Sequence, residues 1–141
     1  MLRKFEVEDI NRVMKIWLES NLEAHSFVKA EYWYSNEKTV RALMLESEIY
    51  VFEKNDILGF VGMEKEYLAG IFVEKKYRDM GIGKLLLDYI KNIREKFTLN
   101  VFKENTGAVN FYLREGLNII SEEVDEATNK VAYLMEWKKE D

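Results

Sequence analysis

Apolar positions along the chain recur at two different spacings, which predicts a mixture of helices and strands. Helical spacing runs over residues 7–21 and again over about 30–46, where it would turn inward Tyr32, Trp33, Val40, Leu43 and Met44. Shorter apolar runs typical of strands cover residues 2–5, 49–54, 57–64 and 67–73. After a helix to about residue 96, further strands are predicted up to residue 102 and over 117–124 and 130–137.

This order of elements predicts the fold class. Strands and helices are mixed without strict alternation, which indicates an α+β fold with a mixed, mostly antiparallel central sheet flanked by helices. No repeat, linker or low-complexity stretch interrupts the 141 residues, so we expect one domain over residues 1–141. A chain of this length can bury roughly two-thirds of its unfolded surface.

Two closely spaced glycines follow the apolar run 67–73. Residues 78–84 read Arg-Asp-Met-Gly-Ile-Gly-Lys and lead into an amphipathic segment. Glycines let the backbone turn tightly and approach a ligand, and the first N–H groups of the next helix can bind an anion such as phosphate. The alternative is a glycine turn that merely joins a strand to a helix.

Two better-known phosphate motifs do not fit this turn. A P-loop would need glycine at Arg78 and serine or threonine at Leu85. A dinucleotide-binding fingerprint would need a third glycine at Leu86. The turn therefore belongs to neither class.

A second motif covers residues 99–117. Asn105 follows a strand pattern and is suited to cap a helix, because its side chain can accept bonds from free N–H groups. The short helix has apolar residues at Ala108, Val109, Phe111, Tyr112 and Leu113. Gly116 is placed to end it in a left-handed conformation.

Together the two motifs resemble a known family. Arg78-x-x-Gly81-x-Gly83 followed by Asn105-x-x-Ala108-x-Asn110-Phe111-Tyr112-x-x-x-Gly116-Leu117 is similar to the two acetyl-CoA motifs of the GNAT family of N-acetyltransferases. The resemblance extends over nearly the whole chain, and residues 17–33 are similar to a bacterial subgroup of short enzymes. It implies a sheet splayed between its fourth and fifth strands, with acetyl-CoA bound there as acetyl donor.

The resemblance also implies roles for individual residues. The backbone of the fourth strand would pair with the pantetheine amides at Ile71, Phe72 and Val73. The pyrophosphate would be held by the backbone at Arg78, Asp79, Met80, Gly81, Ile82, Gly83 and Lys84. Asn105 would reach the pantetheine arm, and the cofactor channel would be lined by Ala108, Phe111 and Tyr112.

Aminolysis of a thioester needs an oxyanion donor and benefits from a proton for the departing thiolate. By resemblance, the Val73 N–H is the oxyanion donor, and the Tyr112 hydroxyl gives its proton to the departing thiolate. The alternative interpretation of Tyr112 is an ordinary core aromatic residue beside Phe111.

The general base is harder to assign. Some relatives carry a glutamate five residues before the motif asparagine, where this chain has Asn100, which cannot take the proton. Glu64 and Glu66, just before the fourth strand, are the next candidates, although both could instead flank a surface hairpin. His25 suits proton transfer, since an unperturbed histidine has a pKa near 6.5, or it could be structural.

An aromatic segment that includes His25 resembles the substrate-side loop of the subgroup. The residues expected to face the substrate are His25, Phe27, Tyr32 and Trp33. Three adjacent aromatic residues at 32–34 cannot all face the core, so at least one should be exposed.

Composition narrows the function classes. The net charge of −5 disfavours nucleic-acid binding and is compatible with a cationic amine, although it can also reflect solubility alone. The absence of cysteine excludes a thiolate metal site and a cysteine nucleophile, and we expect no metal. No apolar run approaches the ~18 residues of a membrane span, and no signal peptide is recognisable, so we expect a cytoplasmic protein without membrane association.

These observations predict an acetyl-CoA-dependent N-acetyltransferase that transfers acetyl directly in a ternary complex. The expected acceptor is a primary amine on a protein lysine, a protein N-terminus or a small molecule. The alternative is a non-catalytic acyl-CoA-binding sensor. We expect a monomer or a homodimer.

Overall fold

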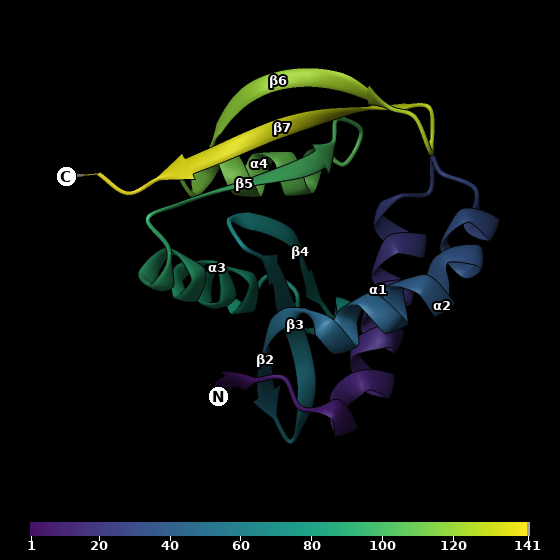
Figure 1. Ribbon diagram of the computed structural model, residues 1–141, viewed down its shortest axis with the longest axis vertical. Helices are drawn as coiled ribbons and strands as arrows, with labels where there is room; N and C mark the ends of the chain where they lie inside the picture. Colours follow the sequence, from purple (N-terminus) through teal and green to yellow (C-terminus); the bar gives the residue numbers. More distant parts are fainter. Residues whose placement is uncertain (141) are drawn as a thin grey trace.

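The computed structural model describes residues 1–140, which form one seven-stranded sheet with helices on both faces (Figure 1). The strands are β1 (Leu2–Lys4), β2 (Glu48–Lys54), β3 (Asp56–Glu64), β4 (Tyr67–Val73), β5 (Lys96–Phe102), β6 (Asn118–Asp125) and β7 (Lys130–Lys138). The helices are α1 (Ile10–Ala24), α2 (Ala30–Glu46), α3 (Ile82–Ile93) and α4 (Thr106–Arg114), with 3-10 turns η1 (Val7–Asp9) and η2 (Lys75–Tyr77). The predicted elements are thus confirmed, with ends shifted by a few residues.

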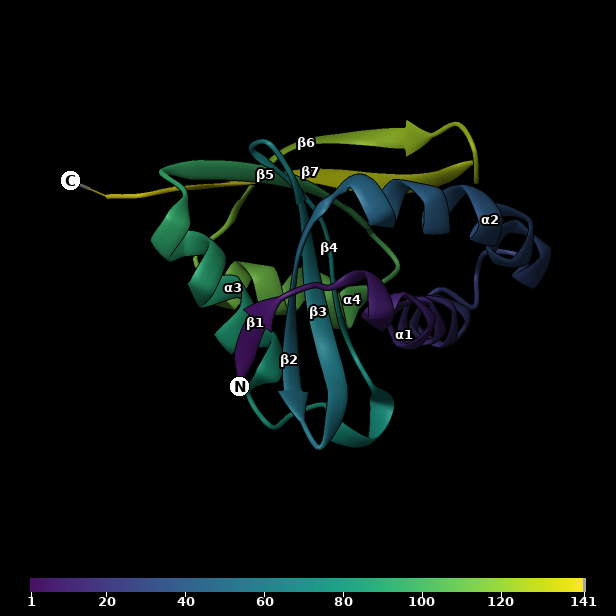
Figure 2. The ribbon, with the colours of Figure 1, turned by 60° about the horizontal axis from the view of Figure 1, so that its bottom comes forward.

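The sheet opens between its two central strands. The strand order is β1-β2-β3-β4-β5-β7-β6, and every neighbouring pair is antiparallel except β4 and β5. In that parallel pair the only matched residues are Tyr67 and Thr98, at the start of β4. The two strands then diverge, as Figure 2 shows. This confirms the predicted splay between the fourth and fifth strands.

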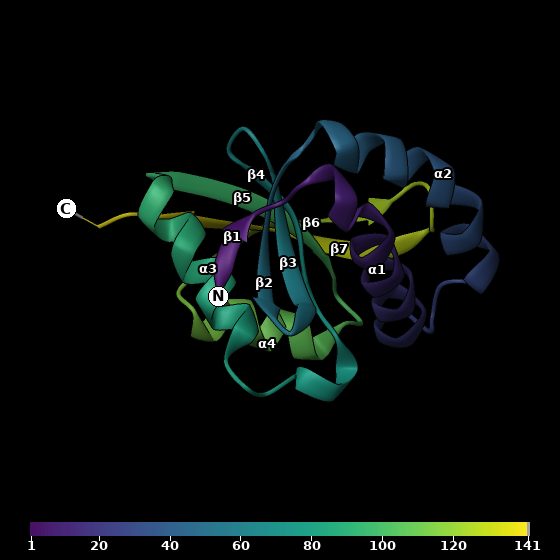
Figure 3. The ribbon, with the colours of Figure 1, turned by 90° about the horizontal axis from the view of Figure 1, so that it is seen from below.

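The helices form two layers with separate apolar cores. α3 and α4 pack on one face, where Leu86, Leu87 and Tyr112 are buried. α1 and α2 cover the other face, seen on the right of Figure 3, and contribute Val13 and Trp33. β3 contacts both cores, because the side chains of a strand alternate between its two faces.

One predicted core position on α2 is wrong. The helix runs over Ala30–Glu46 as expected, and Trp33 and Met44 are buried, but Leu43 is 59% exposed. Successive residues of an α-helix are about 100° apart. Because Met44 faces the core, its neighbour Leu43 is turned toward solvent.

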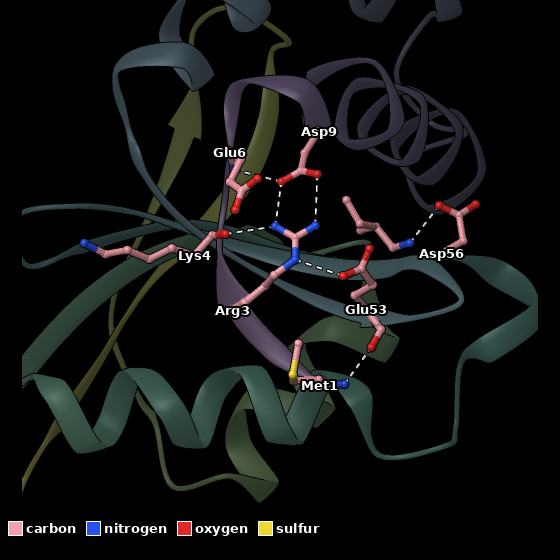
Figure 4. Close-up of polar contacts among 8 residues, drawn as sticks. Met1, Arg3, Lys4, Glu6, Asp9, Glu53 and Asp56 are labelled. Atoms are coloured by element: carbon pink, nitrogen blue, oxygen red, sulfur yellow. Dashed lines mark hydrogen bonds and ion pairs between the residues drawn. The ribbon is translucent and has the colours of Figure 1, made fainter.

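The N-terminal strand is fixed by a polar cluster centred on Arg3 (Figure 4). Its guanidinium donates to both carboxylate oxygens of Asp9, at 2.8 and 3.0 Å, and to Glu53 at 3.0 Å. The Arg3 hydrogen bonds hold the pKa of Asp9 below its usual range. The Asp9 carboxylate also accepts from the Glu6 N–H at 2.7 Å. This cluster ties β1 and β2 to the turn where α1 begins.

Candidate active site

The end of β4 presents backbone groups to the gap beside β5. Phe72 is paired with Phe60, and the Glu74 N–H donates to the Leu58 carbonyl at 2.8 Å. Because bonding directions alternate in an antiparallel ladder, Phe72 faces β3, while the backbone groups of Ile71 and Val73 face the gap.

The Val73 carbonyl has a partner on the far side of the turn. It accepts a bond from Arg78 Nε at 3.2 Å. The Val73 N–H points into the gap and stays available as a donor. Of the three residues predicted to pair with pantetheine, Ile71 and Val73 therefore have the suitable orientation.

The glycine turn leads directly into α3, whose first N–H groups have no partner within the helix. Asp79 and Gly81 both have positive φ, of 65° and 82°, and Gly81 caps the helix. A Cβ built on Gly83 would lie 3.6 Å from the Phe111 ring, an ordinary contact. Packing does not demand glycine at position 83, whereas a ligand lying against the backbone there would. The turn therefore fits a pyrophosphate group.

The basic side chains around this turn are mostly paired with carboxylates. Arg78 forms an ion pair with Glu23 of α1, and Lys84 contacts Asp88 at 3.2 Å and Glu115 at 3.0 Å. An anion bound at this turn would thus depend mainly on backbone N–H groups and the helix dipole. The positive charge near the turn is therefore largely balanced by neighbouring carboxylates.

Tyr112 reaches the gap from α4 with an unused hydroxyl. The residue is 8% exposed, and among residues 1–140 its hydroxyl makes no hydrogen bond. Burial, with a smaller contribution from the phenol of Tyr67, raises the pKa of Tyr112 well above its ordinary value. The hydroxyl is therefore protonated at neutral pH and can donate to a ligand.

Tyr67 was missed by sequence reasoning. Asn100 Nδ2 donates to the Tyr67 hydroxyl at 2.9 Å across the gap between β4 and β5. The position expected to carry a base in some relatives therefore carries an amide that orients a phenol. An aromatic residue at a strand start gave no signal of this, since the contact depends on the register of two strands.

Glu64 and Glu66 lie in one cavity with Tyr67. The cavity has a volume of about 510 Å³ and is lined by Glu64, Lys65, Glu66, Tyr67, Lys96, Phe97, Thr98 and Glu136. Both glutamates are exposed, Glu64 at the end of β3 and Glu66 on the turn before β4. The structure thus brings the two candidate bases to the residue that contacts Asn100.

His25 connects α1 to the cofactor motif through both ring nitrogens. Asn105 Oδ1 accepts from the Ala108 N–H at 3.3 Å, which confirms the predicted cap and leaves Asn105 Nδ2 to donate to His25 Nε2 at 3.0 Å. His25 Nδ1 therefore carries the proton and donates to Asn21 Oδ1 at 2.9 Å. Burial lowers the pKa of His25 to about 4. The ring is neutral and fully partnered, as in a structural role.

The other substrate-side candidates gather around His25. Its ring stacks on Trp33 with centroids 5.4 Å apart and meets Phe27 edge-on at 5.6 Å. Trp33 is only 8% exposed, while Tyr32 packs edge-on against it. Tyr34 is 53% exposed, which confirms that the three aromatic residues do not all face the core.

Features expected of other site classes are absent from the described part of the chain. Residues 1–140 contain no group of three or more histidine, aspartate or glutamate side chains placed to bind a metal ion. No helix in the same range combines the length and apolar composition needed to cross a membrane.

Comparisons with known proteins agree on one family. Residues 46–116 match the acetyltransferase (GNAT) domain. The chain is 33% identical to the peptidyl-lysine N-acetyltransferase YiaC of Escherichia coli K12, over 97% of this chain and 96% of YiaC. It is 27% identical to the peptidyl-lysine N-acetyltransferase YjaB of the same strain, over 89% of this chain and 87% of YjaB.

Solved structures share the fold. The apo-form of YjaB from Escherichia coli matches with a TM-score of 0.86 and 24% identity, covering 99% of this chain and 98% of YjaB. The structure of YncA from Salmonella typhimurium with its cofactor acetyl-CoA matches with a TM-score of 0.69 and 12% identity, covering 100% and 94% of the two chains.

Proposed function

The chain belongs to the GNAT family of acetyltransferases, and we propose that it acetylates lysine side chains of proteins with acetyl-CoA as the donor. YiaC and YjaB are named N-acetyltransferases, and the structure of YncA, which shares the fold, holds its cofactor acetyl-CoA. Lysine is the acceptor that the names of YiaC and YjaB specify, and these relatives match this chain over most of its length.

One observation carries the catalytic interpretation. The Tyr112 hydroxyl lies at the gap between β4 and β5, is protonated, and has no partner among residues 1–140. The hydroxyl is not sealed from solvent, so it is free to donate a hydrogen bond to a ligand that enters the gap. Acetyl-CoA supplies the activated acetyl group, and its sulfur is the acceptor that Tyr112 suits.

The remaining residues fit the donor. The glycine turn from Arg78 to Lys84 can bind the pyrophosphate, and the Ile71 and Val73 backbone groups can pair with pantetheine as an added strand would. The Val73 N–H can stabilise negative charge on the thioester oxygen. Phe111 and Ala108 pack beside this channel.

The alternative, a non-catalytic acyl-CoA-binding sensor, is less well supported. A sensor would need no general base, which would account for Asn100 where some relatives carry a glutamate. However, a sensor would also need no proton donor, so the Tyr112 hydroxyl would have no role. A sensor would bind acetyl-CoA without transferring the acetyl group, so the two functions can be separated in one assay.

The test uses acetyl-CoA and three acceptors, with thiol release and mass spectrometry as readouts. The acceptors are a peptide with one lysine and a blocked N-terminus, a lysine-free peptide with a free N-terminus, and spermidine. We expect acetylation of the lysine peptide. Transfer only to the N-terminal peptide or to spermidine would overturn the lysine assignment, and binding of acetyl-CoA without transfer to any acceptor would favour the sensor.

We also propose that the enzyme is cytoplasmic and that it is a monomer or a homodimer. The location and the oligomeric state both stay predictions from the sequence. Cell fractionation tests the location, and light scattering of the purified protein tests the assembly.

A further inference from the structure

We propose that the Tyr67 hydroxyl takes a proton from the acceptor amine and passes its own proton into the cavity that contains Glu64 and Glu66. The inference rests on the proposed function, because it needs an amine acceptor at the gap between β4 and β5. It assigns the proton route that the amide at Asn100 leaves open.

Tyr67 lies at the point where the two central strands separate. Tyr67 is the β4 residue matched with Thr98, so it stands where β4 and β5 begin to separate. Its phenol is close enough to Tyr112 to contribute to the raised pKa of that residue. Tyr67 therefore stands at the opening of the gap, where the amine must approach the thioester.

The Tyr67 phenol is held in place by Asn100 of β5. Asn100 Nδ2 donates to the Tyr67 oxygen at 2.9 Å, which fixes the phenol and occupies one of its two lone pairs. The second lone pair can accept a bond from an amine N–H, while the hydroxyl hydrogen stays free to be donated. An amide in this place orients the phenol without itself taking a proton.

The cavity beside Tyr67 gives the proton a destination. Tyr67 shares the cavity of about 510 Å³ with Glu64 and Glu66. The titratable groups around Tyr67 are Glu64, Lys65, Glu66, Lys96, Glu136 and Tyr112. Water in the cavity can receive the proton that leaves Tyr67, and the exposed carboxylates can accept it in turn.

Tyr67 and Tyr112 together account for every proton that moves during acetyl transfer. In one concerted relay, an ammonium group gives a proton to the Tyr67 oxygen as the hydroxyl proton passes to water, and the neutral amine then forms the N–C bond as the C–S bond breaks. Tyr112 gives its proton to the sulfur and is reprotonated by the second proton that the nitrogen loses. One proton in total is released to solvent for each amide formed.

The test compares Tyr67→Phe with wild type from mildly acidic to alkaline pH, using the blocked lysine peptide. At neutral pH we expect kcat to fall about 10²-fold, the lower end for general acid–base catalysis. The loss should shrink as the pH approaches the lysine pKa of about 10.4, where the amine deprotonates without help. Calorimetry with coenzyme A should give an unchanged affinity.

Two further variants, Tyr89→Phe and Asn100→Ala, serve as controls. Tyr89→Phe alters a tyrosine of α3 that packs against Tyr50, outside the site, and should leave kcat unchanged. Asn100→Ala frees the phenol and should give a smaller loss with the same pH dependence. A Tyr67→Phe loss that is constant with pH, wild-type activity in that variant, or weakened coenzyme A binding would each overturn the inference. If wild type transfers only to the N-terminal peptide, the lysine assignment fails and the same comparison is made with that peptide.

Discussion

At the scale of single residues, the site depends on which polar atoms already have partners. The Tyr112 hydroxyl has none among residues 1–140, whereas both ring nitrogens of His25 are occupied. A group without a partner can serve a ligand at no cost to the fold. A fully bonded group is part of the framework, and its removal should affect stability first.

Tyr112→Phe should therefore lower activity without lowering stability. We expect kcat to fall about 10²-fold, the low end for a general acid, because a thiolate of pKa about 8.5 leaves tolerably well without a proton. The KM for acetyl-CoA and the thermal midpoint should change little, since no hydrogen bond is lost. Steady-state kinetics and thermal denaturation check this. If Tyr112→Phe keeps the wild-type kcat in an assay limited by the chemical step, Tyr112 only lines the cofactor channel.

His25→Gln should flatten the pH dependence of stability. The pKa of folded His25 is about 4, below its ordinary 6.5, so between these values the unfolded chain binds more protons than the folded chain. Wild-type stability should fall as the pH drops from about 6.5 to 4, and the glutamine variant should lose less over that range. Denaturant unfolding at several pH values measures the difference. Parallel curves would show that His25 is not buried as a neutral ring.

At the scale of elements, the proposed cofactor site is made by the end of a strand and the start of a helix. β4 supplies the Val73 N–H, and α3 supplies the N–H groups of the turn that Gly81 caps. The neighbouring positive side chains are engaged with Glu23 and Glu115. The affinity for acetyl-CoA should therefore respond more to the backbone of the turn than to surface charge.

Gly83→Asp tests this element directly. A carboxylate at the start of α3 would repel the pyrophosphate, so calorimetry should detect no acetyl-CoA binding, while circular dichroism should show a folded protein. Gly83→Ala is the matched control, because its Cβ would meet Phe111 at an ordinary 3.6 Å and adds no charge. It should weaken binding less. Unchanged affinity in folded Gly83→Asp would remove the pyrophosphate from this turn.

At the scale of the whole molecule, the two apolar cores share the central strands. Phe60 of β3 belongs to the core under α1 and α2, and its neighbour Val61 belongs to the core under α3 and α4. Neither helical layer can be removed without exposing one face of the same strand. We therefore propose that the chain is one domain.

This predicts a single cooperative unfolding transition, which the tryptophans can report separately. Trp17 and Trp33 lie in the core under α1 and α2, while Trp137 packs against the core under α3 and α4. A Trp137→Phe variant and a Trp17→Phe, Trp33→Phe double variant each leave one core observed by fluorescence. Within each variant, the fluorescence and circular dichroism transitions should coincide. Separate midpoints would indicate two folding units.

The sequence by itself determined the elements and the two cofactor motifs. Spacing of apolar residues is a local property, so α2 and β4 were predicted with their observed bounds, and the Asn105 cap depends only on the residues that follow it. The tertiary structure alone decided the contacts of Tyr67 with Asn100, 33 residues apart, and of His25 with Asn105, 80 residues apart. Such contacts depend on strand register and on how helices dock, and residue spacing encodes neither.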